Sequence, residues 1–186
     1  MCSPVAHILV GLSIYTVATP RKDLSKNWKI IFFIIFLTVL PDFDFLIMMV
    51  TKNLSDHRTY THSLLFSVVA GYLFYKIAQA KYPSFRVTFW LSFALIFSHA
   101  VVDAFVADGF HPGNVVLFYP LPYLISSPIP IFDPIDWAKS DDWLFSFETA
   151  KAIFKEFIIT ATLLVVVYYM KICRFSLKHR SKNAKH

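Results

Sequence analysis

The sequence predicts an all-α protein, a polytopic transmembrane helix bundle of about five spans with a proline-rich outer loop. Of the 186 residues, 56% are hydrophobic and 16% are charged. The mean hydropathy of +0.55 is high for a water-soluble chain. Long apolar runs alternate with short polar connectors along the whole sequence. A soluble domain of this size could not bury so many apolar side chains, so we expect one integral-membrane domain over residues 1–186.

The first two apolar runs predict helices over residues 5–18 and 28–50. Ser3 followed by Pro4 is typical of a helix start, because serine caps helix N-termini and proline fits the first turn. Pro41 interrupts the second run, since its ring removes one backbone hydrogen bond and disfavours a helical residue before it. The sequence therefore predicts a helix that breaks near its end.

Three more runs predict helices over residues 60–78, 86–107 and 149–172. Between the last two, residues 108–148 are rich in proline and too polar to span, so we expect an outer loop there. Residues 171–186 form a basic tail. In the third helix a threonine, Thr59 or Thr61, is expected to cap the N-terminus.

The basic residues predict how the bundle is oriented. Of the 18 lysines and arginines, four lie in the first connector, three in the third-to-fourth loop and six in the tail. The positive-inside rule then predicts an outside N-terminus and a cytoplasmic C-terminus. The net charge of +6 is explained by this sorting and by membrane lipids, so we expect no nucleic-acid partner. Cys2 and Cys173 fall on opposite sides in this topology, and no disulfide is expected.

Ionisable side chains gather at the outer ends of the predicted helices. They are His7, Asp42, Asp44, His57, His62, His99 and Asp103. At membrane depth such groups are costly and mark functional sites by default. His99 and Asp103 are four residues apart, so they share one helix face within reach of one ion. Imidazoles with carboxylates and no thiolate suit zinc, manganese or iron. The sequence predicts one or two divalent transition-metal ions, with a buried structural His-Asp pair as the alternative.

The break at Pro41 bears on the two aspartates that follow it. In an unbroken helix, Asp42 and Asp44 would point about 200° apart, because each residue turns the helix by about 100°. A broken helix allows the two carboxylates to converge. We expect Asp44 to be a ligand or general base, and Arg58 and Ser63 to contact substrate, since a guanidinium suits phosphate or carboxylate. The expected metal ligands are His7, Asp42, His57, His62, His99 and Asp103.

These residues form three sequence motifs. They are Pro41-Asp42-Phe43-Asp44, His57-Arg58-x-x-Thr61-His62-Ser63 and Ser98-His99-x-x-x-Asp103, with His7 before them and Gly109 and Pro120 after them. In this pattern the chain resembles the YdjM-like family of bacterial inner-membrane, metal-dependent hydrolases, and it is distantly similar to zinc-dependent phospholipase C. The resemblance implies hydrolysis of a phosphoester, or of another ester or amide, in a lipid or lipid-linked substrate at the outer membrane face.

Two other classes of function stay open. A metal-ion or proton transporter would also use buried histidines and aspartates, but the inner halves of the predicted helices hold almost no polar groups for an ion path. A non-catalytic scaffold would not need so many ligand-type residues. Three further residues fit turns or helix caps as well as they fit a site. They are His111, Asp133 and Asp136.

Overall fold

The structure is a computed structural model of the 186-residue chain. It describes residues 2–19, 28–44, 46, 50, 58–83, 87–107, 115–135 and 146–183, and the side chains of the last segment to residue 174. The regular elements of this part of the chain are helices, whereas residues 115–135 form turns and extended segments, and two isolated β-bridges join Val106 to Phe132 and Val115 to Ile125. Its elements are α1 (Pro4–Ala18), α2 (Trp28–Val39), the 3-10 helix η2 (Leu40–Phe43), α4 (Leu64–Lys81), α5 (Phe89–Ala104) and α6 (Phe147–Asn183).

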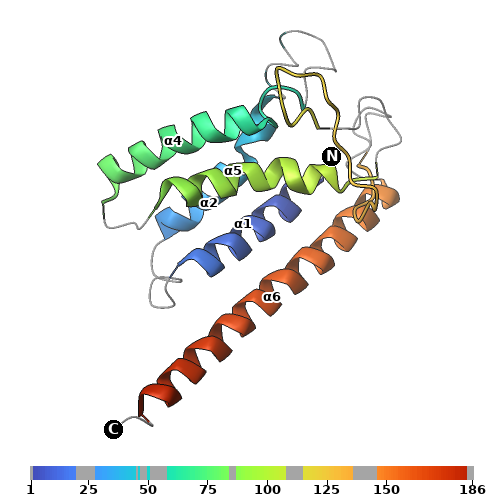
Figure 1. Cartoon of the computed structure of the whole chain (residues 1–186). Helices are drawn as coiled ribbons and strands as arrows, with labels where there is room; N and C mark the ends of the chain where they lie inside the picture. Colours follow the sequence, from blue (N-terminus) through green and yellow to red (C-terminus); the bar gives the residue numbers. More distant parts are fainter. Residues whose placement is uncertain are drawn as a thin grey trace.

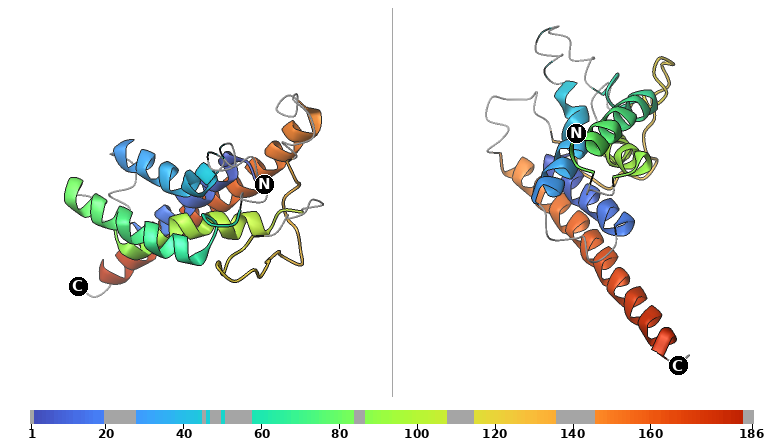
Figure 2. Two further views of the ribbon diagram at one scale, coloured as in Figure 1. Left: turned by 90° about the horizontal axis from the view of Figure 1, so that it is seen from above. Right: turned by 90° about the vertical axis from the view of Figure 1, so that its left-hand side faces the viewer.

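The helices form a bundle centred on α1 and α5. Helix α1 packs on α2, α5 and α6, while α5 also packs on α4 and α2. Figure 1 shows α6 running past α1, and its C-terminal half extends beyond the other helices there and in the right-hand view of Figure 2. The main core lies where α1, α2, α4 and α5 meet, and its most buried side chains include Ile34, Leu37, Leu95 and Ile96.

The predicted polytopic transmembrane bundle is wrong, because no helix in the described residues is both long enough and apolar enough to cross a membrane. A bilayer core needs roughly 20 apolar residues. Helices α1, α2 and α5 have 15, 12 and 16 residues, and α4 has 18 with Lys76 and Lys81 in its last turns. Helix α6 has 37 residues, but its uncharged stretch lies only between Glu156 and Lys171. The predicted orientation of the termini depended on those spans and loses that support.

The predicted break at Pro41 is confirmed. Helix α2 ends at Val39, and Leu40–Phe43 continues as a 3-10 helix that carries Pro41 in its first turn. The break turns the chain at the point where the two aspartates begin, so Asp42 and Asp44 leave the axis of α2 in directions that a continuous helix would not give.

Two glycines allow close approaches between helices. A Cβ atom at Gly11 of α1 would lie 2.2 Å from Cγ2 of Thr38 on α2, and one at Gly71 of α4 would lie 3.0 Å from the backbone of Phe93 on α5. Both contacts leave no room for a larger residue. The first of them sets the position of the end of α2 relative to α1.

Candidate metal centre

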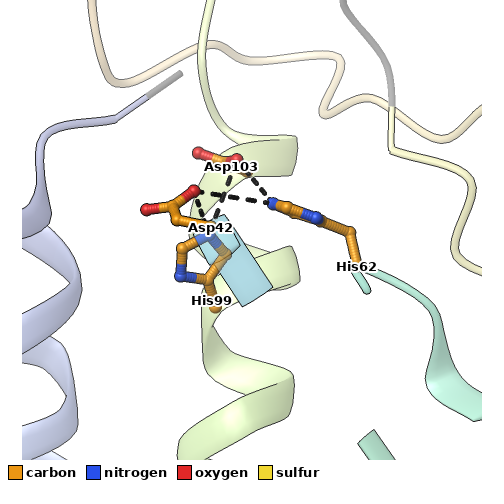
Figure 3. A group of neighbouring side chains, drawn as sticks. All are labelled: Asp42, His62, His99 and Asp103. Atoms are coloured by element: carbon orange, nitrogen blue, oxygen red, sulfur yellow. Dashed lines mark hydrogen bonds and ion pairs between the residues drawn. The ribbon is translucent and has the colours of Figure 1, made fainter. Parts of the chain in front are cut away.

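Four side chains from three parts of the chain, three of them buried and one partly buried, converge at one point. Their ligand atoms all lie within 4.8 Å of one another, and Figure 3 shows them pointing toward a common centre. The 3-10 helix η2 contributes Asp42, the turn before α4 contributes His62, and α5 contributes His99 and Asp103. We call these residues the four-residue cluster. The predicted pairing of His99 with Asp103 on one helix face is therefore observed, and the residues after the Pro41 break join it.

Within the four-residue cluster, the Nε2 atom of each histidine lies near one carboxylate oxygen of each aspartate. His99 Nε2 lies 3.1 Å from Asp42 Oδ1 and 3.9 Å from Asp103 Oδ2. His62 Nε2 lies 3.4 Å from Asp103 Oδ2 and 4.0 Å from Asp42 Oδ1. Donors placed about 2.0–2.1 Å from a tetrahedral zinc ion would lie about 3.3 Å apart. The four nitrogen–oxygen distances range from 3.1 to 4.0 Å around this value, so the donor set could hold one small divalent cation after small side-chain movements.

The orientation of His99 leaves a position between His99 and Asp42 for a second proton or a cation. Its Nδ1 lies 2.7 Å from the backbone carbonyl oxygen of Thr38, which can only accept a hydrogen bond. Nδ1 therefore carries a proton, and Nε2 of a neutral ring turns a lone pair toward Asp42 Oδ1. Two acceptors 3.1 Å apart in a buried site repel each other unless a second proton or a metal ion lies between them.

Asp44 contacts the ring nitrogen of His62 that faces away from the centre. The Nδ1 atom of His62 lies 3.1 Å from Thr61 Oγ1 and 3.4 Å from Asp44 Oδ2. Asp44 Oδ2 also accepts hydrogen bonds from the Arg58 backbone amide at 3.0 Å and from Thr61 Oγ1 at 2.8 Å. Asp44 thus stabilises the turn that carries His62. Its carboxylate faces His62 Nδ1, on the side of the ring away from the centre. The two aspartates of the predicted motif thus face opposite ring nitrogens of His62, and Asp42 also faces His99.

Electrostatics at the centre favour charged forms despite burial. Burial opposes charge on His62, but its contacts with Asp103 and Asp44 outweigh that effect and raise its pKa to about 9. Burial alone would raise the pKa of Asp103, but the Arg58 guanidinium and His62 hold it well below its usual range. For Asp42, His99 outweighs burial and lowers the pKa. Both carboxylates are therefore ionised and ready to bind a cation.

Asp103 connects the four-residue cluster to the N-terminal segment and to Arg58. Its Oδ1 atom accepts a hydrogen bond from the Cys2 backbone amide at 3.0 Å and lies 3.6 Å from His7 Nε2. Its Oδ2 atom faces His62 and lies 3.3 Å from Arg58 Nε. One oxygen is thus fixed by the N-terminal segment, while the other points into the centre.

The predicted ligand His7 lies beside the four-residue cluster without belonging to it. Its ring stacks on His99 with centroids 3.7 Å apart and planes 11° from parallel. It is 1% exposed, and within the described residues neither ring nitrogen makes a hydrogen bond. Burial, followed by the nearby charge of His99, lowers its pKa. His7 is therefore a neutral ring packed against a member of the four-residue cluster.

Two predicted substrate-contacting residues have different surroundings. Arg58 is 5% exposed and adopts a φ of 65°, a left-handed backbone conformation that is uncommon for residues other than glycine. Its guanidinium lies against Asp103. Ser63 is the N-cap of α4, because its Oγ accepts from the Phe66 amide at 3.0 Å and donates to the Tyr60 carbonyl at 2.8 Å. This cap replaces the predicted threonine cap.

Some predicted residues cannot be placed in the site. His57, Gly109, His111 and Asp136 lie outside the described residues. Asp133 is described, and its half-exposed side chain forms an ion pair with Lys155 at 2.8 Å. A surface ion pair of this kind is common for an aspartate in a turn. The roles predicted for His57 and the other residues outside the described part stay predictions.

The structure adds residues that sequence reasoning missed. Glu156 of α6 is fully buried, and its carboxylate accepts hydrogen bonds from Ser3. A carboxylate inside an apolar helix was a usable signal, the same one that identified His99 and Asp103. The Thr38 carbonyl and the Cys2 amide are backbone groups, and no sequence pattern could have identified them.

Comparison with known families gives one match. A family model described as YdjM inner membrane protein matches residues 1–176 of the chain. The match includes the four-residue cluster, Asp44, Arg58, His7 and Glu156. Comparison with curated proteins and with solved structures gives no match.

Proposed function

The chain belongs to the YdjM inner membrane protein family, and from this premise we propose that it is a metal-dependent hydrolase with one ion in the four-residue cluster. The observation that carries the proposal is the contact of His99 Nε2 with Asp42 Oδ1 at 3.1 Å while Nδ1 donates to Thr38. A bound cation removes the repulsion between these two acceptors. Histidine fixed by a backbone carbonyl on its other nitrogen is the usual arrangement of a metal-ligating imidazole.

Zinc and manganese suit the donor set best. Two imidazole nitrogens and two carboxylate oxygens provide borderline and hard ligands without thiolate. The side chain of Asp42 is 13% exposed, whereas those of His62, His99 and Asp103 are fully buried. Water and substrate would therefore reach the ion past Asp42. When bound, a divalent ion lowers the pKa of a coordinated water to about 7 and makes hydrolysis possible near neutral pH.

The chain's own side chains supply orientation and charge. Asp44 contacts the ring nitrogen of His62 that faces away from the centre, so we assign to it the orientation of His62 in place of the predicted base role. Arg58 lies within 3.3 Å of Asp103 and would place a guanidinium beside a bound anion. His7 lies outside the set of four donors, and its role as a ligand of a second ion stays a prediction.

We propose a phosphoester of a lipid or lipid-linked molecule as the substrate. The buried Arg58 favours an anionic group, because its planar fork matches phosphate oxygens. An exposed apolar face on α4 favours a lipid, since Leu65, Val69, Tyr72 and Leu73 are each more than half exposed. These residues recur on one side of the helix that begins directly after His62 and Ser63. The family description as inner membrane proteins agrees with such a substrate.

The transporter alternative has less support from the surroundings of the four-residue cluster. An ion path needs ligands on both sides of a buried site. One turn before His99 on α5, the core consists of Leu95 and Ile96, which pack with Ile34 of α2 and offer an ion no ligand. Access past Asp42 on one side fits an enzyme that admits and releases substrate at the same face.

Hydrolysis measured with purified protein in detergent micelles tests the proposal. The substrates are phospholipids, polyprenyl phosphates and neutral lipid esters, each with added Zn²⁺ or Mn²⁺ and with a chelator. We expect metal-dependent cleavage of at least one phosphoester by the wild type and by Asp133→Ala, and none by His99→Ala. Asp133 is the matched control, because it is an aspartate with a surface ion pair. Cleavage by His99→Ala at the wild-type rate, or no cleavage of any substrate, would contradict the proposal.

A further inference from the structure

The N-terminal segment Cys2–Ser3 connects two buried carboxylates on different helices. The Cys2 amide donates to Asp103 Oδ1 of α5 at 3.0 Å, and the Ser3 amide donates to Glu156 Oε2 of α6 at 2.8 Å. The Ser3 hydroxyl also donates to Glu156 Oε2. All four residues are at most 3% exposed. Two successive amides thus link Glu156 to a member of the four-residue cluster.

Ser3 occupies the N-cap position of α1, but its side chain makes no cap hydrogen bond. An N-cap serine ordinarily accepts from the amide two or three residues later, which stabilises the helix. Here the hydroxyl turns to Glu156 instead. Pro4 follows at the first helical position, where its missing amide leaves no donor to satisfy. Ser3 therefore lacks the side-chain cap hydrogen bond of α1, and its hydroxyl binds the Glu156 carboxylate on α6.

Burial of the Glu156 carboxylate costs free energy of folding unless a specific partner compensates for the lost water. It is fully buried, and its Oε1 atom makes no hydrogen bond within the described residues. An apolar residue would satisfy packing between α1 and α6 at lower cost. Within the described residues, the Glu156 carboxylate accepts hydrogen bonds from Ser3 and also interacts with the Cys2 side chain, so its contacts serve the position of the N-terminal segment.

We propose that Glu156 is a positioning residue that fixes the Asp103 carboxylate through the Cys2–Ser3 segment and thereby sets the metal affinity of the four-residue cluster. The inference rests on the proposed function, because it needs an ion at the cluster. With Oδ1 held by the Cys2 amide, Asp103 points Oδ2 at His62 Nε2, 3.4 Å away. Loss of Glu156 leaves Ser3 without its acceptor, the segment shifts, and Asp103 is free to rotate away from the centre.

The test compares Zn²⁺ affinity of the full chain and three variants by calorimetry, with thermal unfolding of the metal-free proteins measured in parallel. Glu156→Leu removes both acceptor oxygens, and we expect affinity to fall about 10- to 100-fold, the effect usual for residues that orient ligands. Glu156→Gln keeps an oxygen for the Ser3 amide and is expected to restore affinity close to wild type. Thr160→Val is the matched control, since Thr160 is a buried polar residue of α6 whose hydroxyl donates to the Glu156 backbone carbonyl, which every variant at residue 156 keeps.

The outcomes separate this inference from the proposed function. Equal affinities of Glu156→Leu and Thr160→Val would overturn it, as would an equal loss in Glu156→Gln and Glu156→Leu, while zinc binding by the wild type would leave the proposed function intact. A wild type that binds no zinc would overturn both. If Glu156→Leu does not fold, Ser3→Ala replaces it, because it removes one of the donors to Glu156. Unchanged affinity in Ser3→Ala would then contradict the inference.

Discussion

His99 Nδ1 lies 2.7 Å from the backbone carbonyl oxygen of Thr38, and this contact joins the candidate metal centre to the last turn of α2. The orientation of the His99 ring thus depends on how closely α2 approaches α5. Thr38 is in turn packed against Gly11 of α1. The position of α1 is therefore coupled to the geometry of the centre, although Gly11 has no side chain that could reach an ion.

The first prediction concerns Gly11→Ala. The added Cβ would lie 2.2 Å from Thr38 Cγ2, so α1 and α2 must separate. We expect the free energy of unfolding to fall by about 1–3 kcal/mol, the usual cost of overpacking, and Zn²⁺ affinity to fall because the Thr38 carbonyl moves. Thermal unfolding and calorimetry measure the two effects.

A compensating substitution distinguishes crowding from other causes. Thr38→Ser removes the clashing methyl group while keeping the backbone carbonyl that orients His99. We expect the double variant Gly11→Ala with Thr38→Ser to recover most of the stability and affinity that Gly11→Ala loses, since residues in contact show non-additive effects. Strictly additive losses in the double variant would refute the proposed coupling.

The second prediction concerns Asp44→Asn. Contacts with Asp103 and Asp44 raise the pKa of His62 to about 9 against burial, which lowers it. Removing the charge of Asp44 should lower the pKa of His62 in the metal-free protein, because one of the groups that stabilise the imidazolium is lost. NMR titration of the histidine ring signals measures this shift, with Asp133→Asn as the control. An unchanged pKa of His62 in Asp44→Asn would rule out the orienting contact.

The third prediction is proton release on metal binding. The pKa of His62 is raised from 6.5 to about 9, so its ring carries the extra proton at pH 7.5. A metal ligand must be neutral imidazole, and binding therefore displaces that proton. We expect zinc binding to release about one proton per chain at pH 7.5 and affinity to rise with pH up to about 9. Calorimetry in buffers of different ionisation enthalpy counts the protons, and affinity that does not rise with pH would oppose this assignment.

The fourth prediction separates phosphoesters from neutral substrates. Arg58→Lys keeps the positive charge but loses the planar fork that binds two phosphate oxygens. We expect turnover of a phosphoester to fall and lysine not to rescue it, while cleavage of a neutral lipid ester, where the wild type shows it, is unchanged. Parallel rates on the two substrates measure the difference. Equal losses on both would assign Arg58 to the support of Asp103 alone.

Much of the candidate site was predictable because its members are rare residue types in an apolar sequence. The break at Pro41 predicted that Asp42 and Asp44 can converge, and in the structure both lie near His62. Helical spacing predicted that His99 and Asp103 share a face. The sequence could not show that Asp44 faces Nδ1 of His62, because that contact depends on the turn in which the Thr61 hydroxyl donates to Asp44.

The fold was predicted less well, because hydropathy measures apolar content and not helix length. The apolar runs that were predicted to be membrane spans form helices that are shorter than a span, such as α2, which ends at Val39, and α5, which ends at Ala104. The contacts of Glu156 depended on the packing of α6 on α1, which joins residues more than 150 positions apart. No local pattern encodes such a contact.

Metal content of the purified protein tests the central claim most directly. The wild type, His99→Ala and the control Asp133→Ala are loaded with Zn²⁺ or Mn²⁺, passed over a desalting column and analysed by mass spectrometry of the elements. The four-residue cluster predicts one equivalent of a divalent metal per chain in the wild type and in Asp133→Ala, and loss of most of it in His99→Ala. Equal metal content in the wild type and His99→Ala, or none in either, would contradict the account.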